Sequence, residues 1–246
     1  MVASVNERLE LTLVDGQTLK IAGVDPPRPT PDQPTIDAKS RDRLGQWLAG
    51  QEILYRPMGQ RQDRWGRLPA LVFAPAASPR SPPLPLAEAL LDAGLARFEP
   101  GPEARQCRAA LLAAESGARA AALGLWADPY YAIIPATDRA SFPEKAGTSV
   151  IVEGRVTGVE SGQFRSTLLF GPRRGWHFSV TILQRNIKIF DAAGFNLAGL
   201  AGHTLRVRGL LDMRFGPQIE IANPDEIEVV SEDQGEISLA PAPLRR

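Results

Sequence analysis

Residues 15–27 read DGQTLKIAGVDPP, and this stretch decides how the first half of the chain folds. Its Asp15-Gly16 dipeptide is typical of a tight turn between strands. Apolar residues alternate with polar ones on both sides of that turn, at Leu9, Leu11, Leu13, Leu19 and Ile21. Because alternation with period two is the pattern of a half-buried strand, residues 5–25 are predicted to form paired strands. The following PPRPTPDQP (26–34) is predicted to be a loop, since proline neither continues a helix nor pairs in a central strand.

The rest of the first half alternates between helical and strand-like segments. Ser40 is the expected N-cap of a short helix that closes at Gly50. Residues 52–56 and 68–73 are predicted strands joined by the polar turn QRQDRWGR. Residues 86–94 are predicted as a helix that ends at a glycine, and residues 102–123 as a longer helix.

The second half contains five strand-like runs. One helical segment, NIKIFDAAG (186–194), lies between the third and the fourth run. The runs are TSVIVEGRVTGVE, FRSTLLFG, WHFSVTIL, HTLRVRGLLDMRFG and QIEIANPDEIEVV. Five strands with a helix in that place are the arrangement of an OB-fold, a small Greek-key barrel.

These patterns predict a mainly β protein with helices, built from two domains. The first, an OB-type β-barrel plus helices, is expected at residues 5–128, and a second five-stranded OB-fold-like barrel at 147–230. Residues 129–146 lack periodicity and are predicted to be a linker, and residues 231–246 a loose tail.

The amino-acid composition excludes several classes of function. The 246 residues include 28 basic and 28 acidic side chains, one cysteine and two histidines. One cysteine excludes an intrachain disulfide and a CxxC metal or redox site, and a neutral balance argues against a dedicated polyanion binder. No apolar run is long enough to span a membrane. Without a recognisable signal peptide the chain is expected to be cytoplasmic, or exported or periplasmic if a leader has been removed. The sequence does not indicate an oligomeric state.

Five segments of the first half occur in an order that resembles a known family. They are DGQTLKIAGVDPP (15–27), LAGQEILY, DRWGRLPALVF (63–73), LAEALLDAGLARF (86–98) and CRAALLAAESGARAAALGLW (107–126). In this order and spacing they resemble thermonuclease-like (staphylococcal nuclease-like) domains over about residues 5–128. The resemblance implies an OB-type barrel with helices beside it and an ancestral calcium-dependent phosphodiesterase activity on nucleic acid.

The resemblance also implies which residues would carry that activity. Asp25 matches the metal-binding aspartate of a DxP step, and Arg67 matches one of two phosphate-binding arginines. Lys20 stands where the second arginine is expected, and lysine keeps the charge but loses the bidentate fork. Calcium would be the cofactor of such a site, with Asp25 as the one metal ligand matched.

Two positions depart from the family pattern. Arg28 stands where the resemblance places the glutamate that acts as general base, and a cation there would cost a nearby Ca²⁺ several kcal/mol. The first metal-binding aspartate is also missing, with Glu7 as the nearest substitute. We therefore expect a non-catalytic site that needs no cofactor. The ordinary alternatives are a surface arginine in a hairpin turn for Arg67, a loop cap for Asp25 and a solvated strand residue for Lys20.

The second half carries basic and aromatic residues on its predicted strands. Residues 145–230 contain 10 basic and 8 acidic side chains. OB-folds bind single strands by stacking bases on aromatic residues while a basic groove follows the backbone. The candidates for nucleic-acid binding are Lys20, Arg67, Arg165, Arg173, Arg174, Trp176, Arg206 and Arg208.

Three functions therefore remain open from the sequence. The first is a non-catalytic nuclease-like protein that binds single-stranded DNA or RNA. The second is a protein–protein adaptor or cell-envelope scaffold, to which two barrels of neutral charge with long proline loops are suited. The third is a calcium-dependent nuclease whose metal site is rebuilt from Glu7, Asp25 or Asp32 through the proline loop.

Overall fold

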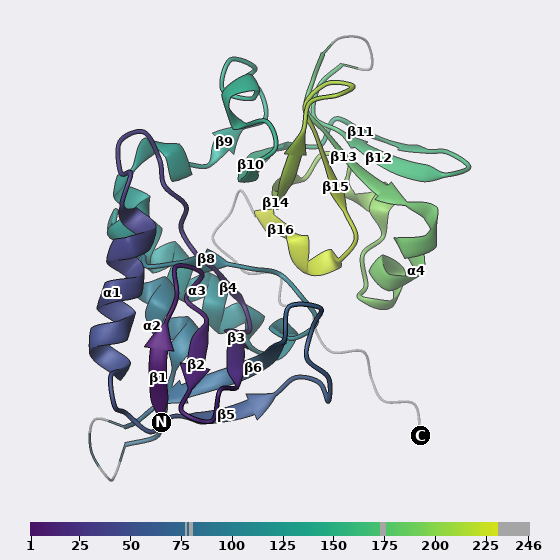
Figure 1. Cartoon of the computed structure of the whole chain (residues 1–246). Coiled ribbons are helices and arrows are strands. Elements are labelled where there is room, and N and C mark those ends of the chain that lie inside the picture. Colours follow the sequence, from purple (N-terminus) through teal and green to yellow (C-terminus); the bar gives the residue numbers. More distant parts are fainter. Residues whose placement is uncertain (77, 79–80, 173–175, 231–246) are drawn as a thin grey trace, which may run out of the picture. The chain divides into compact units, whose positions relative to one another are not determined.

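The computed structural model describes residues 1–76, 78, 81–172 and 176–230 (Figure 1). Contacts between residues divide the chain into two compact units, Met1–Ala132 and Ile133–Arg246. The predicted tail, 231–246, and the candidates Arg173 and Arg174 lie outside the described residues. Among the helices that are described, none is long and apolar enough to cross a membrane.

A six-stranded sheet forms the base of unit 1. Its order is β1-β2-β3-β6-β5, with β7 paired to β6, and of its ladders between described residues only β3–β6 is parallel. A separate antiparallel pair joins β4 to β8. The strands are β1 (Val2–Val5), β2 (Leu11–Leu13), β3 (Thr18–Ile21), β4 (Val24–Asp25), β5 (Leu54–Pro57), β6 (Arg67–Ala74), β7 (Leu84–Pro85) and β8 (Arg97–Phe98).

Three α-helices and three short 3₁₀ helices complete unit 1. They are α1 (Ile36–Leu48), α2 (Leu86–Asp92), η1 (Arg105–Cys107), α3 (Arg108–Ala120), η2 (Gly124–Ala127) and η3 (Pro129–Tyr131). The first helix begins earlier than the sequence predicted, with Thr35 rather than Ser40 at the N-cap. Ser40 is buried inside the helix, because the helix starts directly after the last proline of the loop.

The core of unit 1 follows from the alternation seen in the sequence. Leu11, Leu19 and Ile21 face inward from β2 and β3 and are at most 2% exposed. Leucines of α1 and α2 pack against them in the same cluster, among them Leu44 and Leu90. Burying each such side chain contributes about 1.5–3 kcal/mol to stability. Because these apolar residues must face the core, the residues that alternate with them on the strands point away from it, on the side of the pocket.

Unit 2 contains an eight-stranded sheet in the order β11-β12-β13-β15-β14-β10-β9, with β16 paired to β14. The helix α4 (Gln184–Ala192) lies between the third and fourth of the predicted runs, as expected. The strands are β9 (Ile134–Pro135), β10 (Ser149–Arg155), β11 (Gly158–Ser161), β12 (Arg165–Leu169), β13 (Ser179–Leu183), β14 (Thr204–Asp212), β15 (Gln218–Ile221) and β16 (Ile227–Val230). Short 3₁₀ helices are η4 (Pro143–Lys145), η5 (Leu197–Leu200) and η6 (Pro224–Glu226).

The prediction of a mainly β fold with helices is confirmed. Two of the predicted runs are each divided into two strands, the first into β10 and β11 and the last into β15 and β16. In both units the ladders between described residues form open paths, so the two closed barrels stay predictions. In unit 2, only residues 156 and 157 separate β10 from β11, although these strands lie near opposite ends of the path.

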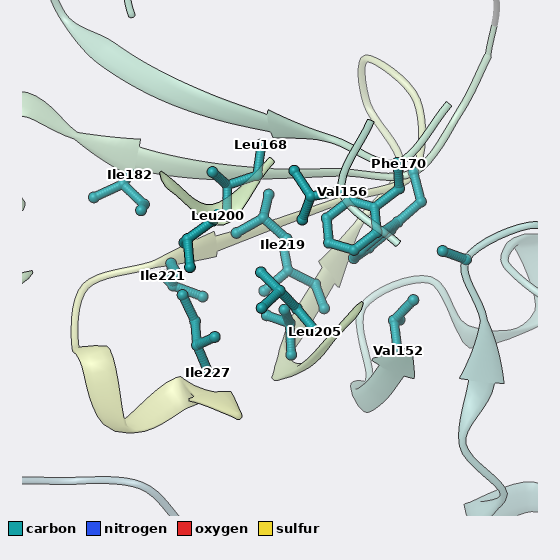
Figure 2. Packing of buried hydrophobic residues seen from close by; sticks show 14 of the residues in the cluster. Val152, Val156, Leu168, Phe170, Ile182, Leu200, Leu205, Ile219, Ile221 and Ile227 are labelled. Atoms are coloured by element: carbon teal, nitrogen blue, oxygen red, sulfur yellow. The ribbon is translucent and has the colours of Figure 1, made fainter. Parts of the chain in front are cut away.

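Inward-facing residues of the sheet form the core of unit 2 (Figure 2). Ile182 of β13, Leu205 of β14 and Ile219 of β15 are fully buried there. Phe178, the residue directly before β13, stacks on Phe142 with ring centroids 5.6 Å apart. Three strands of the sheet and one residue from the preceding segment therefore share one core.

The segment predicted as a linker, 129–146, is folded. β9 pairs in parallel with β10, and the side chain of Phe142 is fully buried in the core of unit 2. At its other end Tyr131 is buried in unit 1. Prolines and polar residues surround these two buried aromatic residues in the sequence, so the segment shows no periodic pattern. The division between the units falls after Ala132 and not over a free linker.

Candidate functional site

A cavity of about 680 Å³ in unit 1 brings the family-matching residues together. It is lined by the β1–β2 connection, β3, β4, the proline loop and the turn before β6. Nine charged side chains line it: Glu7, Arg8, Glu10, Lys20, Asp25, Arg28, Asp37, Arg67 and Glu99. Lys20, Asp25 and Arg67 all line this cavity, whereas Asp32 is not part of the lining.

Asp25 is held by an arginine of its own unit. β4 and β8 pair so that Asp25 lies opposite Arg97, and Arg97 Nη2 donates to Asp25 Oδ2 at 2.7 Å. The Arg97 side chain is only 9% exposed, so this ion pair is largely shielded from water. Arg97 also lies over the ring of Tyr131, with 5.3 Å between the guanidinium carbon and the ring centroid. The carboxylate expected to bind a metal is thus neutralised by a fixed cation.

Arg67 is held by two carboxylates. Its Nη1 donates to Glu10 Oε1 at 2.5 Å, and its Nε and Nη2 each lie 2.7 Å from Asp63 Oδ2. The hydrogen bond from Arg67 lowers the pKa of Asp63 to about 2, and in return Asp63 and then Glu10 raise the pKa of Arg67. The guanidinium also lies 4.6 Å from the ring centroid of Trp65. Nε, Nη1 and Nη2 of Arg67, the groups that would bind a phosphate, are therefore already bonded to carboxylates.

Lys20 has a weaker partner. Its Nζ lies 2.8 Å from Glu99 Oε2, with the two side chains 31% and 42% exposed. An exposed ion pair of this kind contributes about 0–1 kcal/mol, so a ligand can replace it at little cost. Lys20 is the one of the three family-matching residues that a ligand can readily engage.

Calcium does not fit the donors that the pocket offers. Among the described residues no group of three or more Asp, Glu, His or Cys side chains is placed to hold a metal. Asp25 is paired with Arg97, and Glu7 is exposed and paired with Arg41 at 3.2 Å. Hard Ca²⁺ requires six to eight oxygen ligands. The described donors of this pocket therefore fall short of a calcium site.

Glu10, Asp128 and Tyr131 are among the residues of the site that sequence reasoning missed. Glu10, directly before β2, is only 7% exposed because Arg67 covers it. Asp128 and Tyr131 lie about a hundred residues from the pocket in sequence, in a segment without periodicity. The alternation of LELTL placed Glu10 on a face opposite the leucines, but no local pattern indicates its partner.

Asp128 and Tyr131 hold the proline loop. Thr30 Oγ1 donates to Asp128 Oδ2 at 2.5 Å. The Tyr131 hydroxyl accepts from the backbone N–H of Arg28 at 2.8 Å and donates to the carbonyl of the same residue at 2.7 Å. Burial raises the pKa of Tyr131, so this hydroxyl keeps its proton and remains a donor at neutral pH. The loop that carries Arg28 into the pocket is therefore fixed at two points.

Two candidates of unit 2, Arg206 and Arg208, form ion pairs within the sheet. Arg206 lies between two carboxylates on neighbouring strands, at 2.6 Å from Glu153 and 3.4 Å from Glu228. Arg208 is only 4% exposed and lies 2.6 Å from Glu228. These arginines stabilise the β10–β14–β16 sheet through cross-strand ion pairs and do not form an open basic groove.

Two other candidates of unit 2 reach solvent. Arg165 begins β12 and is exposed. Trp176 is 44% exposed. Nucleic-acid binding by the unit 2 candidates stays a prediction, and Arg173 and Arg174 lie outside the described residues.

Unit 1 combines a small mixed sheet, helices beside it and a charged pocket at Asp25–Pro27. This combination is that of a nuclease-like domain. Residues 18–128 match the model of the family described as staphylococcal nuclease homologue, so this part of the chain is a domain of that family. The resemblance stated from the sequence is thereby confirmed for these residues. No curated protein matches the sequence of the chain.

Proposed function

We propose that this chain is a non-catalytic binding protein of nuclease-like fold, and that it binds single-stranded nucleic acid in the pocket of unit 1. One observation carries the non-catalytic part. Lys20, Asp25 and Arg67 are each paired with an oppositely charged side chain of the same unit. In an active relative these positions would contact metal or phosphate, whereas here a ligand has to compete with an existing ion pair.

The strength of each ion pair decides which of the family-matching cations can bind a phosphate of the ligand. The Arg67–Glu10 pair is nearly buried, and removing one partner from such a pair costs about 3–5 kcal/mol. Arg67 therefore stays with its carboxylates and shapes the pocket. Lys20 is freed for less than about 1 kcal/mol, so it is the family-matching cation that contributes to phosphate binding.

Trp65 supports a ligand with planar groups. Its side chain is 58% exposed at the lining of the pocket, and the guanidinium of Arg64 lies 3.9 Å from its ring centroid. Proteins that bind single strands stack bases on such exposed rings, at about 1–3 kcal/mol per base. An exposed tryptophan beside cations thus fits a single-stranded nucleic acid better than a small inorganic ion.

Binding is tested with a fluorescein-labelled oligothymidylate at low salt and micromolar protein. We expect measurable binding that weakens as salt rises, because counterions return to the released phosphates. Trp65→Ala should weaken it about tenfold, given the energy of one stacked base. Trp47→Ala is the matched control, since Trp47 is also partly exposed but lies on α1 outside the pocket lining. An absence of binding by the unaltered protein overturns the proposal.

A separate assay addresses catalysis. We expect no cleavage of single-stranded DNA or RNA above background with or without calcium. Calcium-dependent cleavage that is lost in Asp25→Ala or Arg67→Ala would show an active nuclease with a rearranged metal site and would refute the non-catalytic proposal.

A protein-adaptor function is favoured by one observation in unit 2. Phe164, in the β11–β12 turn, and Phe215, in the β14–β15 turn, are 76% and 87% exposed. Large aromatic side chains exposed to this degree are enriched at protein contact sites. A pull-down from the native host with the unaltered protein and with a Phe164→Ser/Phe215→Ser variant tests it. A partner retained only by the unaltered protein, together with no oligonucleotide binding, would make the adaptor function the better account.

A further inference from the structure

Two arginines in the pocket have no ion pair with any described residue, in contrast to the other cations there. Arg8 and Arg28 both line the cavity and are exposed. Lys20 and Arg67 are already neutralised by carboxylates. Of the lining carboxylates, Asp37 alone forms no ion pair within the part of the chain that the structure describes. The nine charged lining residues are four cations and five carboxylates, but of those without a described ion pair two are arginines and one is a carboxylate, so Arg8 and Arg28 are the lining cations left to bind an anion.

The backbone of Arg28 is fixed before any ligand binds. Pro29 follows it, and a residue before proline is restricted to extended conformations. The Tyr131 hydroxyl bonds both the N–H and the carbonyl of Arg28, at 2.8 and 2.7 Å. Because these contacts hold the backbone in place, the main entropy lost when a ligand orders Arg28 is that of its side-chain rotamers.

Arg8 is placed by a tight turn of similar rigidity. Asn6 Oδ1 accepts from the backbone N–H of Arg8 at 2.9 Å and of Glu10 at 3.0 Å. Leu9 between them has a φ of 55°, a conformation that costs a non-glycine residue about 1–2 kcal/mol. Leu9 is nevertheless only 1% exposed, so its burial in the core offsets the strain and holds the turn. The turn held by Leu9 therefore places the neighbouring Arg8 at the pocket.

We infer that Arg8 and Arg28 form a metal-independent site for a phosphate group of single-stranded nucleic acid. This inference rests on the proposed function. It assigns to Arg8 and Arg28 the positive charge that the calcium ion would supply in an active relative. A guanidinium remains charged at all physiological pH values and donates a planar pair of N–H groups to phosphate oxygens. It binds the phosphate without polarising water or accepting a proton, so the site retains the ligand and performs no hydrolysis.

The test uses the full chain and a fluorescein-labelled oligothymidylate at low salt. Arg8→Ala and Arg28→Ala should each weaken binding about tenfold, the effect of losing one charged hydrogen-bonding partner. Each should also reduce the slope of log affinity against log salt by about 0.7, the value for one phosphate on a single strand. Arg43→Ala, an exposed arginine of α1 outside the pocket lining, should change neither quantity. EDTA should leave the affinity of the unaltered protein unchanged.

A second probe separates charge recognition from stacking. An oligothymidylate with an uncharged methylphosphonate backbone should bind the unaltered protein and both arginine variants equally weakly. If the charged oligonucleotide binds the unaltered protein but Arg8→Ala and Arg28→Ala bind it equally well, the inference is wrong and the proposed function survives. Loss of binding in EDTA would refute the metal-independent site. Failure of the unaltered protein to bind would overturn both.

Discussion

The hydroxyl of Tyr131 bridges the backbone N–H and carbonyl of Arg28, although the two residues are 103 positions apart in sequence. In this way the last 3₁₀ helix of unit 1 determines the position of the loop at the start of the pocket. The resemblance places a general base at the position of Arg28. The same bridge therefore fixes a cation at the point where an active relative would place a carboxylate.

The first prediction concerns this bridge. Tyr131→Phe removes both hydrogen bonds and leaves the partly buried backbone groups of Arg28 without their partner. We expect the free energy of unfolding to fall by about 1–3 kcal/mol, the penalty for unsatisfied polar groups. Urea denaturation monitored by tryptophan fluorescence measures it.

Tyr55→Phe is the matched control, because Tyr55 on β5 is exposed and forms no hydrogen bond with its hydroxyl in the described part of the chain. It should unfold at the same urea concentration as the unaltered protein. Equal stability of Tyr131→Phe and Tyr55→Phe would contradict a structural role for the bridge.

The second prediction concerns how the stability contributed by Asp63 depends on pH. Hydrogen bonding to Arg67 lowers the pKa of Asp63 from 3.8 to about 2 in the folded protein. Because the folded pKa lies below the unfolded value, the ionised carboxylate stabilises the fold above about pH 4. That contribution is lost as the pH falls from about 4 towards about 2. Asp63→Asn should therefore be less stable than the unaltered protein at about pH 6, with a difference that shrinks towards about pH 2.

Urea midpoints between about pH 2 and about pH 6 measure this difference. Asp92→Asn is the control, since Asp92 is an exposed aspartate at the end of α2 without a described ion pair. A difference between Asp63→Asn and the unaltered protein that stays constant over the whole pH range would show that the Asp63–Arg67 bond does not titrate as expected.

Calcium provides the third prediction. A ligand that binds only the folded state raises stability by RT ln(1 + [L]/Kd). Since Asp25 is paired with Arg97 and Arg28 lies in the same pocket, adding millimolar calcium should not raise the melting temperature. Differential scanning fluorimetry with calcium, magnesium and EDTA tests it. A rise specific to calcium that disappears in Asp25→Asn would refute the prediction.

Local sequence patterns predicted most elements of the fold. The alternation of Leu11 and Leu13, the turn at Gly16 and the glycine that ends α2 each act within a few residues, and the strands and helices lie close to where they were expected. Ser40 was wrongly taken as an N-cap because a good capping residue can equally lie inside a helix. Local chemistry identifies the type of element better than its first residue.

The site was predictable only in part, because its charges depend on distant partners. The motif order implied a shared site for Lys20, Asp25 and Arg67, and all three line one cavity. Their neutralisation by Glu99, Arg97 and Glu10 arises from strand pairing and from the return of the chain at β8. No spacing in the sequence marks these pairs. The same limit applies to Arg206, whose carboxylate partners come from two other strands.

The last prediction concerns the two glycines in the LDAG and LGLW segments. Gly94 and Gly124 both have positive φ, 64° and 54°, and their backbones lie in direct contact. A Cβ on Gly124 would collide with the carbonyl of Gly94, and one on Gly94 with the carbonyl of Leu123. The amide of Leu125 also donates to the Gly94 carbonyl at 2.9 Å, so neither backbone can move away without losing this bond.

Gly124→Ala should therefore destabilise the protein by about 3 kcal/mol or more, since steric overlap adds to the cost of the left-handed conformation. Gly16→Ala isolates the second cost, because Gly16 has a φ of 85° but no atom lies within 4 Å of the place its Cβ would take. We expect about 1–2 kcal/mol for that variant. Urea denaturation of both variants gives the comparison. If the two lose equal stability, the close contact between the Gly94 and Gly124 backbones does not contribute, and backbone conformation alone explains the glycine at position 124.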